Sequence, residues 1–267
     1  MASHEPSLAA NWIETTTHPI RDRVYANQCR NLLALTGALV LPGFFRSEML
    51  DEVVRHAASR ESEAFHANST HNVYLTPPDS SLPPEHPFNR QVASTKGLLA
   101  DDQIPADSPL RAVYGDPTFR LFLCRVLDVD AIHPYADELS SINVHFAAEG
   151  RELGWHFDNS SFAVTTLMQA PVGGGVFEYV AAVRDADAGD MAFDRVDAVL
   201  DGREEPETLR FGPGDLVLFR GRNALHRVTP TVGPVTRMLV VFAFNDQPGI
   251  GLSDSALTTF YGRSGRR

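Results

Sequence analysis

The stretch GWHFDNSSF, from Gly154 to Phe162, places a histidine and an aspartate two residues apart inside a run of strand-forming residues. In a β-strand the side chains at positions i and i+2 point to the same face, so His156 and Asp158 project together while Phe157 points the other way. By itself such a pair is more often two polar residues on a solvent-facing side of a strand than two ligands of a metal site. The rest of the chain has to distinguish these readings.

A third metal ligand is available in FRGRNALHRVTP, where His226 follows the predicted strand Leu216–Phe219 after a short turn. Two imidazoles and one carboxylate on one face of a ferrous ion form the facial triad, which leaves three coordination positions open. Arg237 lies 11 residues further on and begins the apolar run MLVVFAF. A guanidinium entering so hydrophobic a strand needs an anionic partner, because an unpaired buried charge is costly. The four positions together predict an iron site with His156, Asp158 and His226 as ligands.

The surroundings of these residues predict an all-β core. Short β-branched and aromatic runs are separated by turn residues at 139–147, 162–170, 175–183, 215–221 and 236–246. Such runs without intervening helices are typical of an antiparallel sandwich or barrel. Helical spacing is confined to the N-terminal half. We therefore expect an α+β, mainly β protein, with N-terminal helices packed on a jelly roll.

The domain organisation follows from the same pattern. We expect one domain over residues 1–267, with a mostly helical part at 1–130, a jelly-roll core at 131–248 and a tail at 249–267. The segment 66–107 contains Pro77, Pro78, Pro83, Pro84, Pro87 and Pro105 and few periodic apolar positions. A stretch of this kind predicts a lid-like loop.

Composition and charge exclude several classes of protein. The formal net charge of −11 argues against binding a nucleic-acid polymer, because a phosphate backbone requires a basic surface. No apolar run is long enough to span a membrane, and no leader pattern is visible, so we expect a cytoplasmic protein. Two separated cysteines, Cys29 and Cys124, predict neither a disulfide framework nor a zinc knuckle. Oligomeric state is open, with a homodimer as one option.

At the metal-site residues, and in the segments TKGLLADDQIPADSPLRAVY, GGGVFEYV and FGPGDLVLF, the sequence resembles the Fe(II)/2-oxoglutarate-dependent dioxygenases. It is most similar to the small stand-alone branch of amino-acid hydroxylases and halogenases, over about residues 38–248. The resemblance implies a double-stranded β-helix fold, with Fe(II), 2-oxoglutarate and O₂ as cofactor and co-substrates. In the halogenases Gly or Ala replaces the metal-binding carboxylate so that chloride can bind; Asp158 fills that position here, which implies hydroxylation.

The resemblance also suggests residues around the triad. Arg237 would bind the distal carboxylate of 2-oxoglutarate, with Asn143 and Thr229 as further co-substrate contacts. The alternative for Asn143 is a satisfied interior amide, and Thr229 is also an ordinary strand former. No catalytic residue is expected beyond the metal ligands.

The resemblance implies a small-molecule substrate, namely an amino acid or an N-substituted amino-acid derivative. Four residues are candidates for contacting it: Arg90, Lys96, Trp155 and Asn159. The two cations are equally compatible with solvated loop charges, Trp155 with core packing, and Asn159 with a turn.

Three other functions compete with this prediction. The same cofactor chemistry serves nucleotides and other natural-product intermediates, with desaturation or cyclisation as outcomes. A non-oxidative, cupin-like protein that binds a metal or ligand would share the fold, but the cupin His-x-His pair and downstream Glu are missing. Zinc hydrolysis would use the same ligands, yet no general-base Glu accompanies a His-x-x-x-His helix.

Overall fold

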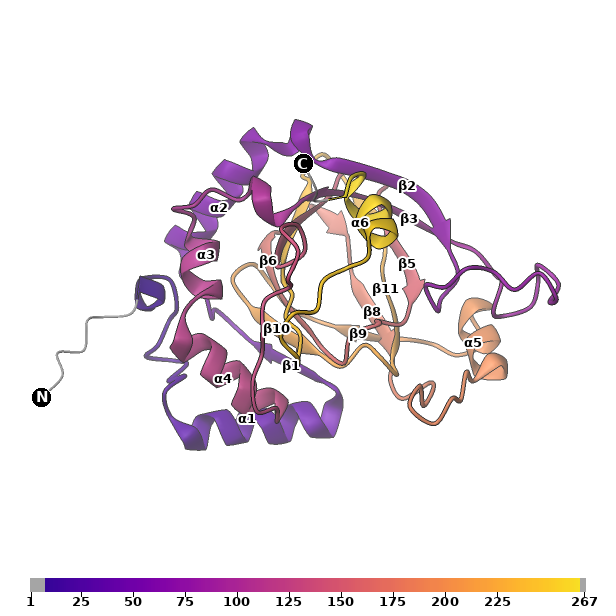
Figure 1. Cartoon of the computed structure of the whole chain (residues 1–267), viewed down its shortest axis with the longest axis horizontal. Coiled ribbons are helices and arrows are strands. Elements are labelled where there is room, and N and C mark those ends of the chain that lie inside the picture. Colours follow the sequence, from indigo (N-terminus) through magenta and orange to yellow (C-terminus); the bar gives the residue numbers. More distant parts are fainter. Residues whose placement is uncertain (1–7, 265–267) are drawn as a thin grey trace, which may run out of the picture.

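The computed structural model describes residues 8–264, in which a curled antiparallel sheet is flanked by helices (Figure 1). The N-terminal part supplies most of the helices: η1 (Leu8–Asn11), α1 (Arg23–Thr36), α2 (Ser47–Ser59), η2 (Glu61–Glu63), η3 (Asp101–Gln103), α3 (Pro109–Tyr114) and α4 (Pro117–Leu127). Capping side chains explain where several begin. The carboxylates of Asp22 and Asp116 accept hydrogen bonds from backbone N–H groups in the first turns of α1 and α4.

One continuous sheet contains eleven strands: β1 (Ala38–Leu41), β2 (Phe65–His71), β3 (Val92–Leu99), β4 (Ile142–Ala147), β5 (Leu153–His156), β6 (Ala163–Gln169), β8 (Phe177–Val180), β9 (Glu207–Leu209), β10 (Leu216–Phe219), β11 (Leu225–Val228) and β13 (Arg237–Phe242). Its order is β1-β10-β6-β13-β4-β3-β5-β11-β8-β9, with β2 paired to β3. β7 (Gly173–Gly174) and β12 (Thr231–Val232) form a separate two-stranded pair. The sheet curls into a nearly closed barrel, which is the jelly roll expected from the sequence.

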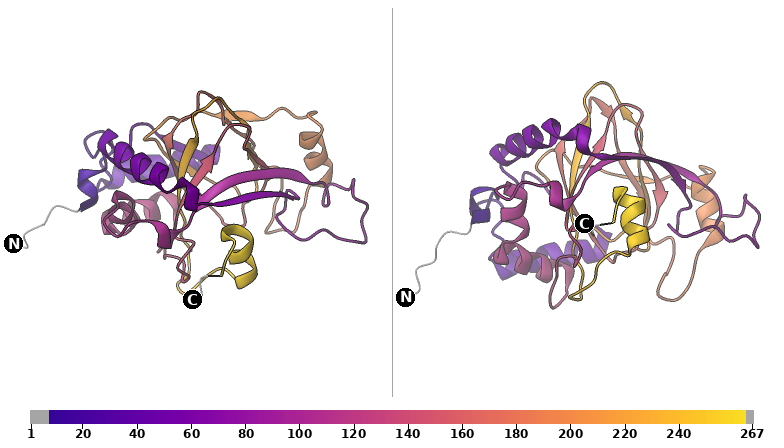
Figure 2. Two further views of the ribbon diagram at one scale, coloured as in Figure 1. Left: turned by 90° about the horizontal axis from the view of Figure 1, so that it is seen from above. Right: turned by 45° about the horizontal axis from the view of Figure 1, so that its top comes forward.

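The main hydrophobic core lies between the helices and the outer face of the larger half of the barrel. Alternation along β4 and β13 sends Val144, Phe146, Val240 and Phe242 into this core. Residues of α1 to α4 complete it, and both views in Figure 2 show these helices gathered on one side of the sheet. The intervening residues of the two strands therefore face the barrel interior, and Arg237 is one of them.

The segment 66–107 is not the continuous loop that the sequence suggested. β2 and β3 form a paired hairpin from Phe65↔Leu98 to His71↔Val92, and only the connection 72–91 lacks regular structure. The prolines other than Pro105 are confined to that connection. The strand at 65–71 escaped detection because FHANSTH is polar and mostly exposed on both faces, so no apolar alternation marks it.

Two further helices flank the smaller half of the barrel. α5 (Phe193–Leu200) packs with Tyr74, Trp155 and Phe157 in a second hydrophobic cluster. α6 (Asp254–Tyr261) lies in front of the barrel in Figure 1, where Leu257 and Tyr261 pack against Leu98 of β3. α6 falls in the predicted tail 249–267, whose last three residues, like residues 1–7, lie outside the described part of the chain.

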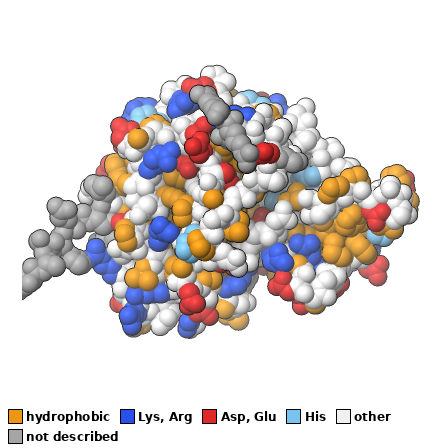
Figure 3. Space-filling view, viewed as in Figure 1, with side chains coloured by type: hydrophobic (Ala, Val, Ile, Leu, Met, Phe, Trp, Pro, Cys, Tyr) orange, Lys and Arg blue, Asp and Glu red, His pale blue; other side chains and the backbone are white. Residues whose placement is uncertain are grey.

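The surface and the helix lengths bear on what the protein contacts. On the face shown in Figure 3, acidic and basic side chains are interspersed. Within residues 8–264, none of the helices combines the length and the hydropathy needed to cross a membrane.

Candidate metal centre

The two histidines of the predicted triad are direct cross-strand partners. His226 in β11 pairs with His156 in β5, while Val228 pairs with Leu153. Two residues of β5, Gly154 and Trp155, therefore oppose the single residue Arg227 of β11 in a β-bulge. Bulges of this kind re-aim side chains next to functional sites. Both imidazoles consequently lie inside the barrel, with ring centroids 4.1 Å apart.

Glycine is required at the bulge because the neighbouring strand comes very close. A Cβ on Gly154 would lie 2.4 Å from the carbonyl oxygen of Ala93 and 2.9 Å from a methyl group of Val92. Real Cβ atoms do not approach backbone that closely. The glycine that opens GWHFD therefore sets the position of the first histidine.

Each imidazole is oriented by a backbone carbonyl two residues earlier. His156 Nδ1 lies 2.9 Å from the carbonyl oxygen of Gly154, and His226 Nδ1 lies 3.0 Å from that of Ala224. A carbonyl oxygen only accepts, so each Nδ1 carries the proton and donates it. Each Nε2 then presents a free lone pair, which is the tautomer that a metal-binding histidine needs.

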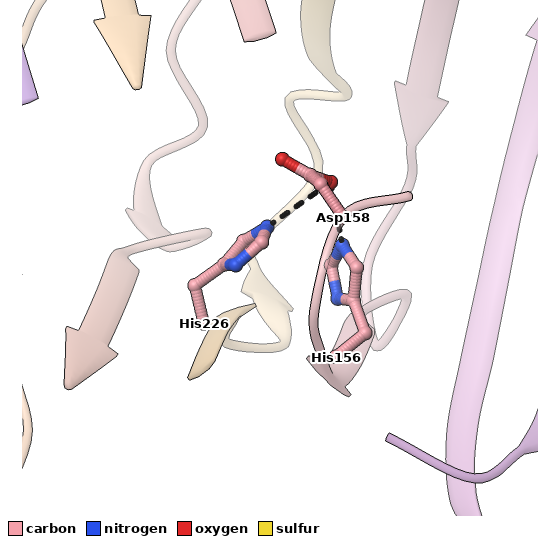
Figure 4. Close-up of side chains that lie close together, drawn as sticks. All are labelled: His156, Asp158 and His226. Atoms are coloured by element: carbon pink, nitrogen blue, oxygen red, sulfur yellow. Dashed lines mark ion pairs between the residues drawn. The ribbon is translucent and has the colours of Figure 1, made fainter. Parts of the chain in front are cut away.

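Asp158 joins the histidines from just beyond the end of β5. Its backbone N–H donates to the carbonyl oxygen of Gly221 at 3.1 Å, and its Oδ1 lies 3.8 Å from His156 Nε2 and 3.5 Å from His226 Nε2. Figure 4 shows the carboxylate and the two imidazoles converging. Asp158 Oδ2 is buried with no hydrogen-bond partner. The ligand atoms all lie within 4.8 Å of one another.

This donor set fits a divalent cation. Metal–ligand bonds of about 2.0–2.2 Å bring neighbouring ligand atoms to roughly 3–4 Å, as observed here. A buried carboxylate oxygen without a partner is also a costly feature that a cation would compensate. Two nitrogen ligands and one oxygen ligand suit Fe(II) with open positions, so His156, Asp158 and His226 would hold the iron.

The protonation states agree with metal binding. Burial, reinforced by the neighbouring charge of His226, lowers the pKa of His156 to about 3. Burial would raise the pKa of Asp158, but the interactions with His226 and His156 outweigh it and lower that pKa below its usual value. His156 is therefore neutral and Asp158 ionised near pH 7, and neither group has to lose a proton before a metal binds.

Gly221 leaves the room that the carboxylate occupies. A Cβ on this residue would lie 2.0 Å from Asp158 Oδ2 and 2.9 Å from His226 Cε1. We expect Gly221→Ala to displace the carboxylate and weaken Fe(II) binding by at least about tenfold, measured by competition with a chromogenic chelator. Gly212→Ala is the matched control, because its Cβ would meet nothing closer than 3.9 Å. Equal iron affinity in both variants, with both folded, would contradict this reading.

Arg237 is the strongest electrostatic feature of the barrel interior apart from the triad. Its side chain is 5% exposed, and burial lowers its pKa to about 10. Among the described residues its guanidinium forms neither a hydrogen bond nor an ion pair. The sequence prediction that this residue begins an apolar strand is confirmed, since Arg237 is the first residue of β13. A buried, unpaired guanidinium is poised for an anion that the protein itself does not provide.

Three more titratable side chains surround this space. Lys96 on β3 is close enough to Asp158 for their charges to interact, and burial lowers its pKa to about 8. His145 on β4 is affected by both Lys96 and Arg237, although burial is the main reason that its pKa falls well below the usual value. The ring of His71, at the end of β2, lies edge-on to His156 with centroids 6.1 Å apart.

Two of the residues proposed to contact substrate have other partners. The Arg90 guanidinium bonds Asp197 at 2.8 Å and Asp201 at 2.7 Å, which ties the 72–91 connection to α5 and its end. Trp155 packs in the second hydrophobic cluster under the guanidinium of Arg227, whose carbon lies 4.7 Å from the ring centroid. The structure thus favours a structural role for both residues. Arg90 is paired with two carboxylates, and strand alternation turns Trp155 away from the face of His156.

Asn143 shares the interior face of β4, as expected, but both ends of its amide are engaged. Its Nδ2 donates to the carbonyl oxygen of Leu139 at 3.0 Å, and its Oδ1 accepts from the Tyr261 hydroxyl at 2.8 Å. These bonds favour the satisfied interior amide over a contact to 2-oxoglutarate. They also attach α6 to the barrel.

Removing this attachment is expected to cost stability and little else. Tyr261→Phe leaves Asn143 Oδ1 buried without its donor, so the free energy of unfolding should fall by about 1–2 kcal/mol in urea titration. The dissociation constant of 2-oxoglutarate should stay within about twofold of wild type, since no charge is lost. Tyr179→Phe, which removes a part-buried bond to Glu207, is the matched control. A selective loss of 2-oxoglutarate affinity in Tyr261→Phe would instead restore Asn143 to the co-substrate site.

The last two candidates lie at the edges of the site. Thr229 Oγ1 accepts a hydrogen bond from the Val176 N–H at 3.0 Å, so it joins the residue directly after β11 to the residue directly before β8. Asn159 is exposed directly after Asp158, and its carbonyl oxygen accepts from Arg222 at 3.1 Å. Its amide side chain stays available for a substrate.

Sequence reasoning missed His71 and Gly221. His71 lies in a polar strand that no periodicity reveals. Gly221, however, lies between the strand LVLF and the distal histidine, and its strand-end position was a usable signal.

Comparison with known families and structures agrees with this geometry. A family model described as HalD, Halogenase D, matches residues 89–254. That span holds all three triad residues, Arg237 and Lys96. The comparison with curated proteins gave no significant match.

Solved structures share the fold at low sequence identity. A 2OG-Fe(II) oxygenase family oxidoreductase from Burkholderia pseudomallei aligns with a TM-score of 0.53 at 12% identity, covering 85% of this chain and 93% of that one. The carbocyclase SnoK from nogalamycin biosynthesis aligns with a TM-score of 0.57 at 13% identity, covering 90% and 93%. A prolyl hydroxylase from Trichoplax adhaerens aligns with a TM-score of 0.54 at 13% identity, covering 84% and 90%. The three likenesses establish the jelly-roll fold.

Proposed function

From the premise that this chain belongs to the Halogenase D family, we propose that it hydroxylates an unactivated C–H bond of an amino acid or an N-substituted amino-acid derivative. The chain is a 2-oxoglutarate-dependent, non-heme iron oxygenase. The observation that carries hydroxylation as the outcome is Asp158, a carboxylate that converges with both triad histidines. Asp158 thus fills the position that the resemblance assigns to the halide in the halogenases.

The residues divide the work as follows. When bound, iron and 2-oxoglutarate supply the oxidation of the C–H bond by O₂, with 2-oxoglutarate leaving as succinate and CO₂. Arg237 binds the distal carboxylate of 2-oxoglutarate, because it is buried and unpaired. His156 and His226 keep their Nε2 lone pairs aimed at one point through their Nδ1–H bonds.

The test begins with the cofactors. Anaerobic addition of Fe(II) and 2-oxoglutarate should produce a visible metal-to-ligand charge-transfer band in wild type. Asp158→Ala should lose or shift the band while retaining its circular dichroism spectrum. A folded wild-type protein without the band, indistinguishable from Asp158→Ala, would contradict the proposal. Succinate release across amino acids, their N-acyl forms and nucleotides then identifies the substrate class.

A cupin-like, non-oxidative protein is the main competing candidate, and two features of the barrel interior, the metal cluster and Arg237, argue against it. The His₂Asp cluster is the only group of metal-ligating side chains recognised within residues 8–264, and it lacks a fourth protein ligand. Arg237 would also have no function in such a protein. Nucleotides and other natural-product intermediates stay open as alternative substrates, and the succinate screen distinguishes them.

A further inference from the structure

Lys96 is the only lysine in the chain, all other cationic side chains being arginine. Lys96 pairs with Ala67 of β2. Strand alternation places Lys96 on the same face of β3 as Ser94 and Leu98, which is the interior face of the barrel, and Gly97 on the opposite face. Through β3 and β4, Lys96 lies level with Ala147, and Ala147 is paired with Arg237. Arg237, which is buried, and Lys96, which is partly buried, thus flank the small side chain of an alanine on the strand between them.

Within residues 8–264, neither cation has a hydrogen-bond or ion-pair partner. Among residues 8–264, Lys96 forms no hydrogen bond and no ion pair, and Asp158 is the only carboxylate whose charge affects it. Asp158 is itself the carboxylate of the candidate metal site. The interior therefore contains an ammonium group that nothing described in the chain neutralises.

The charges of the loaded site show what Lys96 is left to bind. A ferrous ion, the Asp158 carboxylate, the 2-oxoglutarate dianion and the Arg237 guanidinium together sum to zero. The positive charge of Lys96 is then uncompensated in a partly buried position inside the barrel, which favours the entry of another anion. A zwitterionic amino acid would bring an anion but also an ammonium group, and the site offers no second carboxylate to receive it.

His71 supplies a neutral hydrogen-bond acceptor in the same place. Its Nδ1 lies 2.9 Å from the carbonyl oxygen of Asn72, so Nδ1 carries and donates the proton, as in His156 and His226. Its Nε2 is buried and has no hydrogen-bond partner. An unpartnered buried acceptor beside the metal ligands suits an uncharged N–H or O–H donor on a bound molecule.

We propose that Lys96 and His71 form the substrate half of the site and that they select a carboxylic acid whose neighbouring nitrogen is uncharged, as in an N-acylated amino acid. Lys96 pairs with the carboxylate, and His71 Nε2 accepts from the amide N–H. This inference rests on the proposed function, because it assigns 2-oxoglutarate to Arg237 and the iron. It excludes the free zwitterionic amino acid as the preferred substrate.

The first experiment separates the two anion sites. Lys96→Met and Lys96→Arg are titrated anaerobically with Fe(II) and 2-oxoglutarate, and the charge-transfer band gives the 2-oxoglutarate dissociation constant. We expect that constant to stay within about twofold of wild type, while the KM for N-acetylated amino acids rises about 30-fold in Lys96→Met and recovers in part in Lys96→Arg. A large loss of 2-oxoglutarate affinity with unchanged substrate KM would overturn the inference. If wild type itself forms no band, the proposed function fails instead.

The second experiment tests the chemistry of the substrate with matched compounds. Each of a series of N-acetyl amino acids is compared with its N-acetyl carboxamide, its N-methylated form and the free amino acid, with succinate release as the readout. The acids should be accepted, the carboxamides should lose at least about tenfold, and free amino acids should be poorer still. Carboxamides equal to the acids, a preference for zwitterions, or no response to any N-acetyl acid would each overturn the proposal.

The N-methylated compounds also isolate His71. N-methylation removes the N–H, so it should penalise binding to wild type about tenfold but have little further effect in His71→Phe. Equal penalties in both proteins would remove His71 from the substrate site.

A third experiment needs no turnover. Because the chain has one lysine, protein labelled with ¹³C at lysine Cε gives a single side-chain signal. In the Zn(II)- and 2-oxoglutarate-loaded protein, an N-acetyl acid should shift this signal, and the matching carboxamide should not. A signal that responds to neither compound would contradict contact at Lys96.

Discussion

Arg237→Met is expected to weaken 2-oxoglutarate binding by at least about 100-fold while raising the melting temperature of the metal-free protein. The first effect follows from the loss of the charged partner for the distal carboxylate. The second follows because the guanidinium is buried and unpaired in the empty protein, as its lowered pKa of about 10 reflects. Methionine fills the space without a charge to desolvate, so the gain should be on the order of a few kcal/mol.

Two measurements check this prediction. The charge-transfer band gives the 2-oxoglutarate affinity, and calorimetry without ligands gives the melting temperature. Arg227→Met is the matched control, because this arginine is partly exposed, bonds Glu178 at 2.7 Å and stacks on Trp155. It should lose a little stability and leave 2-oxoglutarate binding intact. A lower melting temperature in Arg237→Met with unchanged affinity would show that a structural partner, not the co-substrate, uses Arg237.

Asp158→Gly is expected to reduce hydroxylation by at least about 100-fold and to make the outcome depend on chloride. Removing the carboxylate opens one coordination position. Gly221 has no Cβ, and Asp158 Oδ2 occupies the space that this atom would take. When the carboxylate is removed, this space can accept a monatomic anion beside the histidines. In the halogenases that the sequence resembles, Gly or Ala stands at this position. A chlorinated product should therefore appear alongside residual hydroxylated product.

Mass spectrometry of products made with chloride, bromide or neither checks this prediction, and chelator competition measures the accompanying loss of iron affinity. Asp158→Glu is the control: it keeps a carboxylate in the cavity, so it should lose activity without gaining halide-dependent products. If Asp158→Gly retains iron yet gives the same products with and without chloride, the prediction that a halide can replace the Asp158 carboxylate at the metal is wrong.

The relation between sequence and structure differs from element to element. The strands at β4, β6, β8, β10 and β13 were predictable, because each is a short run rich in β-branched and aromatic residues between turn residues. β2 was not, since its residues are mostly exposed. The residues of the candidate triad were predictable, but the backbone position of Asp158 was not. Asp158 does not continue the strand of His156; it lies beyond β5, where the carbonyl oxygen of Gly221 holds its N–H.

The candidates for co-substrate and substrate contacts show the limit of local reasoning. Arg90 and Lys96 are six residues apart and equally cationic, yet one is neutralised by two carboxylates of the α5 region and the other stands unpaired inside the barrel. The partners of Arg90 lie more than a hundred positions further along the chain. The surroundings of Lys96 are set by the strands that pair with β3. No pattern within the segment 90–96 contains that information.

The sequence by itself determined the candidate ligands of this protein, because His156, Asp158, His226 and Arg237 carry their chemistry in their side chains and occur in this order within a region of predicted strands. Only the tertiary structure decided which polar groups remain without partners. Whether Arg237, Lys96 and His71 are satisfied depends on which strands curl around them. The cost of leaving a charge or a buried acceptor unpaired, which marks a binding site, is a property of that enclosure and not of the residue.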